Sequence, residues 1–207
     1  MLEKLACKLG RNDEVPNIEL AEELSRTGDA IGIEEIIVGL KGADKAVAND
    51  CIKVLYEIGE RKPELIAGYA DEFISLLSSR NNRLAWGSMT ALAKIAELVP
   101  ESIFEKLPVV VSAYEEGSVI SVDNSISVFA ELSKAGDKYA EKALPLLINH
   151  LEKCRPKDVP QHAERASVCF NSGNASAFIG VLENRLPHLA MTGQARINKL
   201  LKKLHSL

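Results

Sequence analysis

Apolar residues return every 37 positions along the middle of the chain, which indicates an internal repeat. Within each repeat they are spaced 4, 3 and 3 residues apart, as on one face of an amphipathic helix. Four columns of this kind are in phase: Ala48, Ala85 and Val122; Ile52, Met89 and Ile126; Leu55, Leu92 and Phe129; Ile58, Ile95 and Leu132.

A second set of columns with the same period precedes the first and predicts a second helix in each repeat. Its members are Ile36, Phe73, Val110 and Leu147; Ile37, Ile74, Val111 and Ile148; Leu40, Leu77, Tyr114 and Leu151. Short polar connections rich in Gly, Asn, Asp or Ser separate the two helices, and such residues end or cap helices. Pro63 and Pro100, also 37 residues apart, mark the first turn of the next unit. The chain therefore reads as a series of antiparallel helix pairs.

These patterns predict a single repeat domain over residues 1–207. We expect a degenerate N-terminal cap at 1–32, with two helices within residues 1–27, and C-terminal capping helices at 173–207. Four repeats fill residues 33–172, as helix pairs at 33–61, 64–98, 101–135 and 138–172. The polar stretch Arg155–Val159 interrupts the fourth pair, so we expect the stacking to change there, with a break in the 37-residue register.

The stretch Glu72–Ala96 resembles a HEAT repeat. Its first helix ends in Leu76-Leu77, Arg83 opens the second helix after a polar turn, and Ala91-Leu92-x-x-Ile95-Ala96 closes it. As a pattern, the resemblance covers roughly residues 33–172. It implies an all-α, right-handed superhelix of the HEAT/armadillo kind, with about five to six antiparallel helix pairs whose second helices line a concave binding face. The function that this resemblance implies is a scaffold that binds a protein partner.

Composition is consistent with a folded protein that has an aliphatic core. Hydrophobic residues make up 46% of the 207 residues and aromatic residues only 5%. A formal net charge of -4 disfavours a nucleic-acid partner. The N-terminus shows no secretion signal, no apolar run approaches the ~20 residues that span a bilayer, and no CxxC pair is present. We therefore expect a cytoplasmic protein with reduced cysteines.

Two histidines and two cysteines follow one another as His-x3-Cys-x7-His-x6-Cys, at His150, Cys154, His162 and Cys169. These side chains are ligands for zinc, and the first two share a helix face. Structural zinc sites, however, usually combine closely spaced ligand pairs near a turn. We therefore expect two surface histidines and two packing thiols, and no metal or other cofactor.

Catalytic motifs are missing from the sequence. It contains no G-x-x-x-x-G-K or G-x-G-x-x-G phosphate loop, no G-x-S-x-G elbow and no His-Glu pair. We therefore expect no catalytic residues and no enzyme activity. Two alternatives stay open: an enzyme or lyase-like subunit with a pocket on the concave face, and a nucleic-acid-binding repeat protein.

The candidate contact surface lies beside the apolar stripe of the second helices. With Ala85 at the centre of that stripe, Trp86 lies about 100° and Thr90 about 140° around the helix. The residues that we expect to contact a partner are Lys53, Arg83, Trp86, Thr90, Lys94 and Asp123. Trp and Arg are common interface anchors. In the alternative interpretation, Trp86 fills the groove between adjacent repeats.

The last helix, Ala195 to Leu207, is basic and amphipathic. Such helices bind acidic membranes or acidic partners in some proteins. More often they pack on the rest of the fold, with lysines at the negative end of the helix dipole. We expect this packing role and no membrane partner.

Overall fold

The computed structural model describes residues 1–206, which form twelve α-helices and no strand. The predicted all-α class is therefore confirmed. The chain divides into two compact units, Met1–Ser125 and Ile126–Leu207, and the boundary between them falls within one helix. The grouping of all repeats into one domain stays a prediction.

The helices follow one another along the described residues in two groups. The first unit holds α1 Val15–Thr27, α2 Ala30–Leu40, α3 Lys45–Arg61, α4 Ala70–Leu76, α5 Asn82–Ile95, α6 Pro100–Glu105 and α7 Leu107–Glu116. Helix α8, Val119–Lys134, crosses the boundary between the units. The second unit continues with α9 Asp137–Lys153, α10 Val159–Ala166, α11 Ala175–Arg185 and α12 Met191–Leu204. Short 3-10 turns are η1 Leu2–Lys4, η2 Pro63–Leu65, η3 Ala67–Tyr69, η4 Ser167–Cys169 and η5 Leu186–His188.

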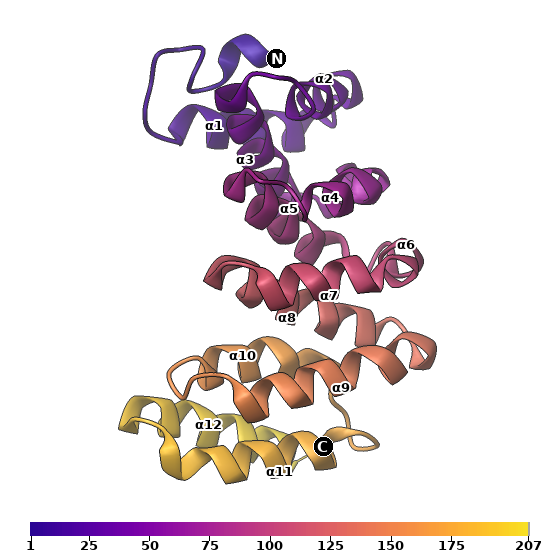
Figure 1. Cartoon of the computed structure of the whole chain (residues 1–207), viewed down its shortest axis with the longest axis vertical. Coiled ribbons are helices and arrows are strands. Elements are labelled where there is room, and N and C mark those ends of the chain that lie inside the picture. Colours follow the sequence, from indigo (N-terminus) through magenta and orange to yellow (C-terminus); the bar gives the residue numbers. More distant parts are fainter. Residues whose placement is uncertain (207) are drawn as a thin grey trace. The chain divides into compact units, whose positions relative to one another are not determined.

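In the first unit, the second helix of each pair packs beside the second helix of the next. Helix α3 lies between α1 and α5, while α2 packs on α3 and α4 on α5 (Figure 1). Helices α1, α3 and α5 therefore form one layer, and α2 and α4 pack against one face of this layer.

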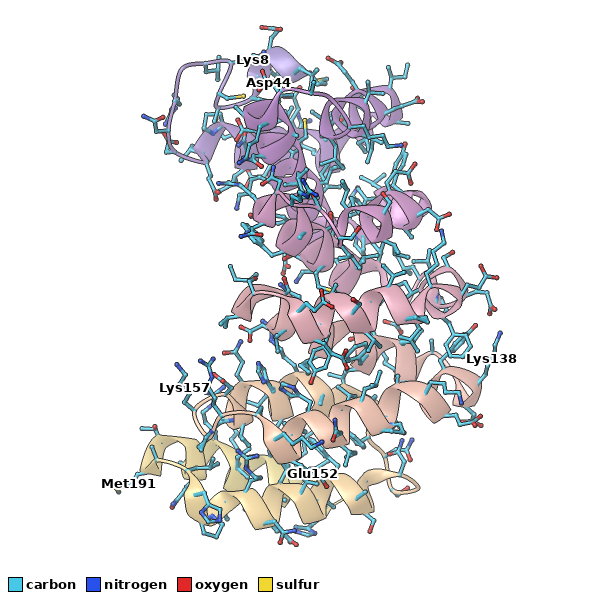
Figure 2. The ribbon with its side chains drawn as sticks, in the orientation of Figure 1. Lys8, Asp44, Lys138, Glu152, Lys157 and Met191 are labelled. Atoms are coloured by element: carbon cyan, nitrogen blue, oxygen red, sulfur yellow. The ribbon has the colours of Figure 1, made fainter. Side chains whose placement is uncertain are left out.

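Two of the predicted polar connections supply capping residues, Asp44 at the start of α3 and Asn81 at the start of α5. The Asp44 carboxylate accepts hydrogen bonds from the backbone N–H groups of Ala46 and Val47 at the start of α3, at 2.9 and 3.3 Å. The ammonium of Lys8 lies 3.6 Å from the same carboxylate (Figure 2). Gly28 ends α1 in the left-handed conformation, with φ of 66°, which a residue without Cβ adopts at little cost.

The repeating apolar columns form the core. Six side chains from the second helices are completely buried: Leu55, Leu92, Phe129, Ile58, Ile95 and Leu132. Four side chains from the first helices are buried to the same extent: Ile36, Phe73, Val110 and Leu147. Burial of aliphatic side chains at two fixed helix faces is what holds neighbouring pairs together.

The 37-residue register continues through the fourth repeat, so the break that we expected at Arg155–Val159 is absent. Ala163, Ala166 and Cys169 take up the columns of Ile126, Phe129 and Leu132 and are themselves buried. The polar stretch forms a closed loop, because the Arg155 side chain donates to the Asp158 carboxylate at 2.6 Å. The loop shortens α10 to 8 residues without shifting its face.

The first helices differ from the prediction in three places. In the second repeat, the 3-10 turns η2 and η3 come before a short α4, in place of one helix from residue 64. Residues 1–27 hold one α-helix instead of two, because the chain turns at Gly10, with φ of 68°, and continues as a loop to α1. In the third repeat the first helix is broken into α6 and α7. Pro108 explains this break, since it has no N–H to donate and its ring clashes with the preceding turn of a continuous helix.

Helix α12 packs on the second unit as expected for a terminal helix. It contacts α10 and α11, and its apolar face is buried: Ile197, Leu200, Leu201 and Leu204. Leu207, the last residue of the predicted helix, lies outside the described residues. Within the described part of the chain, no helix combines the length and the apolar character needed to cross a membrane.

Candidate functional site

The candidate surface on α3 and α5 is organised around the carboxylate of Glu14, which lies just before α1. Lys53 of α3 places its Nζ atom 3.0 Å from one oxygen of this carboxylate and 2.8 Å from Glu57. Arg83 of α5 pairs with the other oxygen of Glu14. One carboxylate thus joins cations from two neighbouring repeats. Arg61 of α3 pairs with Glu57 at 2.6 Å. We call Glu14, Lys53, Glu57, Arg61 and Arg83 the ion-pair network.

Lys53 is the most buried member of this network, at 7% exposure. Burial alone disfavours a charged ammonium. Hydrogen bonds to Glu57 and Glu14 outweigh that effect and raise the pKa of Lys53. The Glu57 carboxyl shows the complementary effect, since its bonds to Lys53 and Arg61 overcome desolvation and lower its pKa. Both side chains are therefore charged at neutral pH and fixed in place by their partners.

Two aromatic rings lie against the network. The ring centroids of Tyr56 on α3 and Trp86 on α5 are 5.9 Å apart, with the planes tilted by 46°. The Arg83 guanidinium lies 6.0 Å from the Trp86 ring, and the Lys53 ammonium 4.8 Å from the Tyr56 ring. Trp86 stays partly exposed. It contacts the neighbouring repeat, as the groove-filling interpretation expects, without being completely covered.

The remaining predicted residues extend this surface along α5 and onto α8. The Thr90 hydroxyl donates to the Trp86 carbonyl at 2.8 Å and accepts from the Asn124 amide at 2.9 Å. Lys94 pairs with Glu60 of α3. Asp123 is half-buried on α8. Lys53, Arg83, Trp86, Thr90 and Lys94 are thus brought onto the adjacent helices α3 and α5, with Asp123 on the next second helix.

A hollow of about 240 Å³ adjoins the ion-pair network at the start of α3. The loop Arg11–Glu14 forms one wall, and Asn49, Asp50 and Arg83 form the other. The Asn81 amide donates to the Asn49 side chain at 2.8 Å beside it. Asn49 precedes Trp86 by 37 residues, so its position on this surface was detectable in the sequence.

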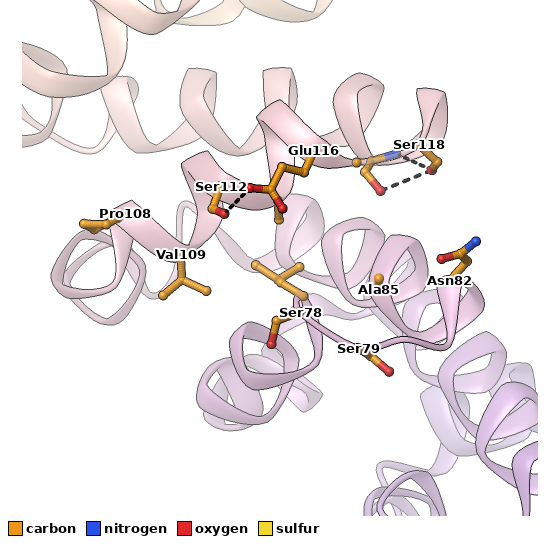
Figure 3. Close-up of a pocket in the computed structure, with 13 residues that line it drawn as sticks. Ser78, Ser79, Asn82, Ala85, Pro108, Val109, Ser112, Glu116 and Ser118 are labelled. Atoms are coloured by element: carbon orange, nitrogen blue, oxygen red, sulfur yellow. Dashed lines mark hydrogen bonds between the residues drawn. The ribbon is translucent and has the colours of Figure 1, made fainter.

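A larger groove of about 770 Å³ opens between the α4–α5 turn and α7 (Figure 3). Its lining is rich in hydroxyl groups: Ser78, Ser79, Ser112, Ser118 and Ser121. Val109, which is 40% exposed, contributes an apolar wall. Sequence reasoning missed this groove, although the polar connections between paired helices at 78–82 and 115–118 contribute to it.

Three of the four candidate metal ligands form a cluster, and the fourth, Cys169, does not belong to it. His150, Cys154 and His162 lie together between α9 and α10. The expected surface location of the histidines is wrong, since His150 and His162 are only 7% and 3% exposed. Cys169 is a packing thiol as expected, buried with its Sγ atom 3.1 Å from the Ala166 carbonyl.

The stacked helix pairs define an all-α helical-repeat protein, and solved structures identify its type. A designed armadillo repeat protein in complex with the peptide (KR)4 matches with a TM-score of 0.68 and 16% identity, over 88% of this chain and 84% of that one. Two engineered proteins from the Northeast Structural Genomics Consortium also match with TM-scores of 0.68. Their identities are 21% and 20%, over 99% of this chain and 96% and 58% of theirs.

This chain therefore has an armadillo/HEAT-like repeat fold. The likeness extends over nearly the whole chain, while the low identities restrict it to the fold. Neither the protein-family models nor the curated proteins give a match.

Proposed function

We propose that this chain is a protein-interaction scaffold that binds an extended peptide segment of a partner protein across α3 and α5. The observation that carries the proposal is the partly exposed pair of Tyr56 and Trp86, flanked by the ion-pair network. Aromatic and Arg side chains supply most of the binding energy in many interfaces. The network also fixes these long side chains beforehand, which lowers the entropy lost on binding.

The charges on this surface match a peptide that carries both signs. A basic side chain would meet the carboxylates of Glu14 and Glu57, and an acidic one would meet Arg83. The designed armadillo protein of the same fold, solved with a peptide, supports the mode of binding by analogy. The contact residues that we propose are those expected from the sequence: Lys53, Arg83, Trp86, Thr90, Lys94 and Asp123.

A reducing compartment such as the cytoplasm fits this proposal. Cys51 and Cys169 are free thiols in core positions, and burial raises the pKa of each to about 12. A neutral thiol of this kind behaves as a small apolar side chain.

The experiment selects linear peptides from a random displayed library with the full chain and measures the Kd of the selected peptides. Trp86 is the only tryptophan, so its emission reports directly on the surface. We expect peptide binding to shift that emission. In Trp86→Ala, measured by fluorescence anisotropy of a labelled peptide, we expect a Kd about 30-fold weaker, the loss of a ~2 kcal/mol anchor.

Val38→Ala is the matched control, because Val38 is 65% exposed on α2, in the other layer of helices. We expect this variant to bind like the parent chain. If the selected peptides bind Trp86→Ala as tightly as the parent chain, the proposed surface is wrong. If the library yields no peptide that binds above background, the proposed peptide-binding function is wrong.

A further inference from the structure

The turn between α9 and α10 gathers three side chains that the proposed peptide surface does not use. The Nε2 atom of His150 lies 2.8 Å from the Nδ1 atom of His162, and the ring centroids are 4.8 Å apart. A donor atom from each of His150, Cys154 and His162 lies within 4.8 Å of the other two. Both imidazoles are buried and Cys154 is half-buried. Two nitrogens and one sulfur therefore converge on one point inside the second unit.

The order of residues along the chain explains this convergence. His150 and Cys154 are four residues apart, at the last turn and the C-cap of α9, so their side chains share a face. The chain then reverses, and His162 in the first turn of α10 faces back towards them. Two ligands at i and i+4 on one helix face bind zinc in H-E-x-x-H sites, and here His162 adds a third ligand from across the turn.

Charged groups around the turn hold its backbone in place. The Arg155 side chain donates to the Asp158 carboxylate at 2.6 Å, which closes the connection. Arg185 of α11 donates to the backbone carbonyls of Leu151 and Cys154, at 2.9 and 2.5 Å. The carbonyl groups that α9 leaves unpaired at its end are thus satisfied by α11. Because these bonds hold the ends of α9 and α10 in place, the three side chains need to move little to bind an ion.

We propose that His150, Cys154 and His162 form a zinc site that fastens α9 to α10. Imidazole nitrogen and thiolate sulfur are preferred ligands of Zn²⁺, at about 2.0–2.1 and 2.3 Å. Tetrahedral geometry with those bond lengths places the donor atoms roughly 3.3–3.7 Å apart. To bind the ion, the two imidazole nitrogens move about 0.5 Å further apart than the 2.8 Å of their hydrogen bond. The Cys154 thiolate moves closer to both nitrogens. A water molecule completes the four-coordinate ion.

Binding of Zn²⁺ changes the tautomer of one imidazole and the protonation of the Cys154 thiol. Without metal, one imidazole donates the hydrogen bond to the other. To bind Zn²⁺, the donating ring moves its proton to its other nitrogen, and the Cys154 thiol releases its own. Each ion bound therefore releases one proton from the chain. Burial raises the pKa of Cys154, while the positive charge of Arg185 opposes that effect.

A buried histidine pair without metal is the competing explanation. It accounts for the 2.8 Å contact between the rings, but it gives Cys154 no part. The only hydrogen bond of the Cys154 thiol among the described contacts is a long one to the Leu151 carbonyl, at 3.9 Å. Metal binding uses all three side chains, and it therefore predicts a spectroscopic signal from sulfur that a histidine pair cannot produce.

Co²⁺ is the probe for this site, because its thiolate complexes absorb in the near ultraviolet and its tetrahedral complexes absorb strongly in the visible. The purified full chain is stripped with a chelator and titrated with Co²⁺, then with Zn²⁺. We expect one Co²⁺ per chain, a sulfur-to-cobalt charge-transfer band, and displacement of Co²⁺ by one equivalent of Zn²⁺. Zn²⁺ is also expected to raise the Tm of the stripped chain.

Two variants test the ligands and two serve as controls. We expect Cys154→Ser to lose the charge-transfer band, and His162→Gln to weaken Co²⁺ binding by about tenfold or more. Cys7→Ser in the first unit and His188→Gln, exposed on η5, are expected to keep both the band and the affinity. Circular dichroism verifies that each variant is folded, and Cys154→Ser, at a half-buried position, suffices if His162→Gln does not fold.

Three results would overturn the proposal. The first is the absence of stoichiometric Co²⁺ or Zn²⁺ binding at micromolar metal. The second is a charge-transfer band that survives in Cys154→Ser. The third is a Tm that Zn²⁺ raises equally in the parent chain and in Cys154→Ser. None of these results bears on the peptide surface, so the two proposals stand or fall separately.

Discussion

The ring of Trp86 on α5 packs against the ring of Tyr56 on α3, with their centroids 5.9 Å apart. The two residues are 30 positions apart, so they do not belong to one repeat column of 37. Their contact depends on how the faces of neighbouring helices meet. It brings an aromatic pair to the surface of the α1–α3–α5 layer, beside cations from both helices.

Removing the partner ring is expected to expose the indole. In Tyr56→Ala, water reaches the face of Trp86 that Tyr56 covers, so the emission maximum moves to longer wavelength and acrylamide quenches the fluorescence more strongly. Because Trp86 is the only tryptophan, the emission spectrum measures this directly. Tyr69→Ala, on the 3-10 turn η3, is the control and leaves the spectrum unchanged. An unshifted Tyr56→Ala spectrum would show that the two rings do not pack in solution.

The ion-pair network predicts a definite loss of stability in acid. The bonds from Lys53 and Arg61 overcome desolvation and hold the pKa of Glu57 below the ordinary value of 4.5. A carboxyl with a lowered folded pKa adds stability above its unfolded pKa, and this contribution disappears as the pH falls through the folded pKa. Glu57→Gln therefore lowers the free energy of unfolding at pH 7, and its stability falls less steeply below about pH 4.5 than that of the parent chain.

Urea denaturation at a series of pH values measures this difference. Glu64→Gln, at an exposed position on η2, serves as the charge-matched control and keeps the parent profile. Parallel curves for Glu57→Gln and the parent chain over the acid range would contradict the assignment of Glu57 to the network.

The repeat was predictable because it depends on local periodicity. The columns through Leu55 and Ile58 follow from helix geometry and the need to bury one face, and both requirements are visible in single segments. The contact of Glu14 with Arg83 joins residues 69 positions apart and depends on the register between α1, α3 and α5. No local pattern contains that register. For the same reason, the spacing of His150 and Cys154 predicts that they share a helix face. It does not show that His162 joins them while Cys169 does not.

Leu92 occupies one of the completely buried columns, whereas Leu98, past the end of α5, is 51% exposed. Truncating a buried leucine removes apolar contacts and leaves a cavity, which lowers the free energy of unfolding by about 2–5 kcal/mol. Truncation at an exposed position changes it little. Leu92→Ala is therefore expected to lower the free energy of unfolding by about 2–5 kcal/mol, and Leu98→Ala by about 0.5 kcal/mol or less. Chemical denaturation measures both. Similar losses in the two variants would contradict the position of Leu92 in the core.

Two helical glycines separate the effect of close packing from that of helix propensity. A Cβ atom at Gly87 of α5 would lie 2.6 Å from a Cγ atom of Ile52 on α3, while one at Gly180 of α11 would meet nothing within 4 Å. Alanine is favoured over glycine in a helix by about 1 kcal/mol. Gly180→Ala is therefore expected to raise the free energy of unfolding by about 0.5–1 kcal/mol.

At Gly87 alanine gains the same helix propensity, but its Cβ atom clashes with Ile52, and this clash cannot easily relax. Ile52 is completely buried and β-branched, so its Cγ atoms have little freedom to rotate within a helix. Overpacking of this kind costs about 1–3 kcal/mol, and we expect Gly87→Ala to be destabilising overall. In an Ile52→Ala background the clash is gone, so the same change at residue 87 is expected to become neutral or stabilising. A double-mutant cycle measures this coupling, and additive effects would show that the helices α3 and α5 do not approach each other closely at Gly87.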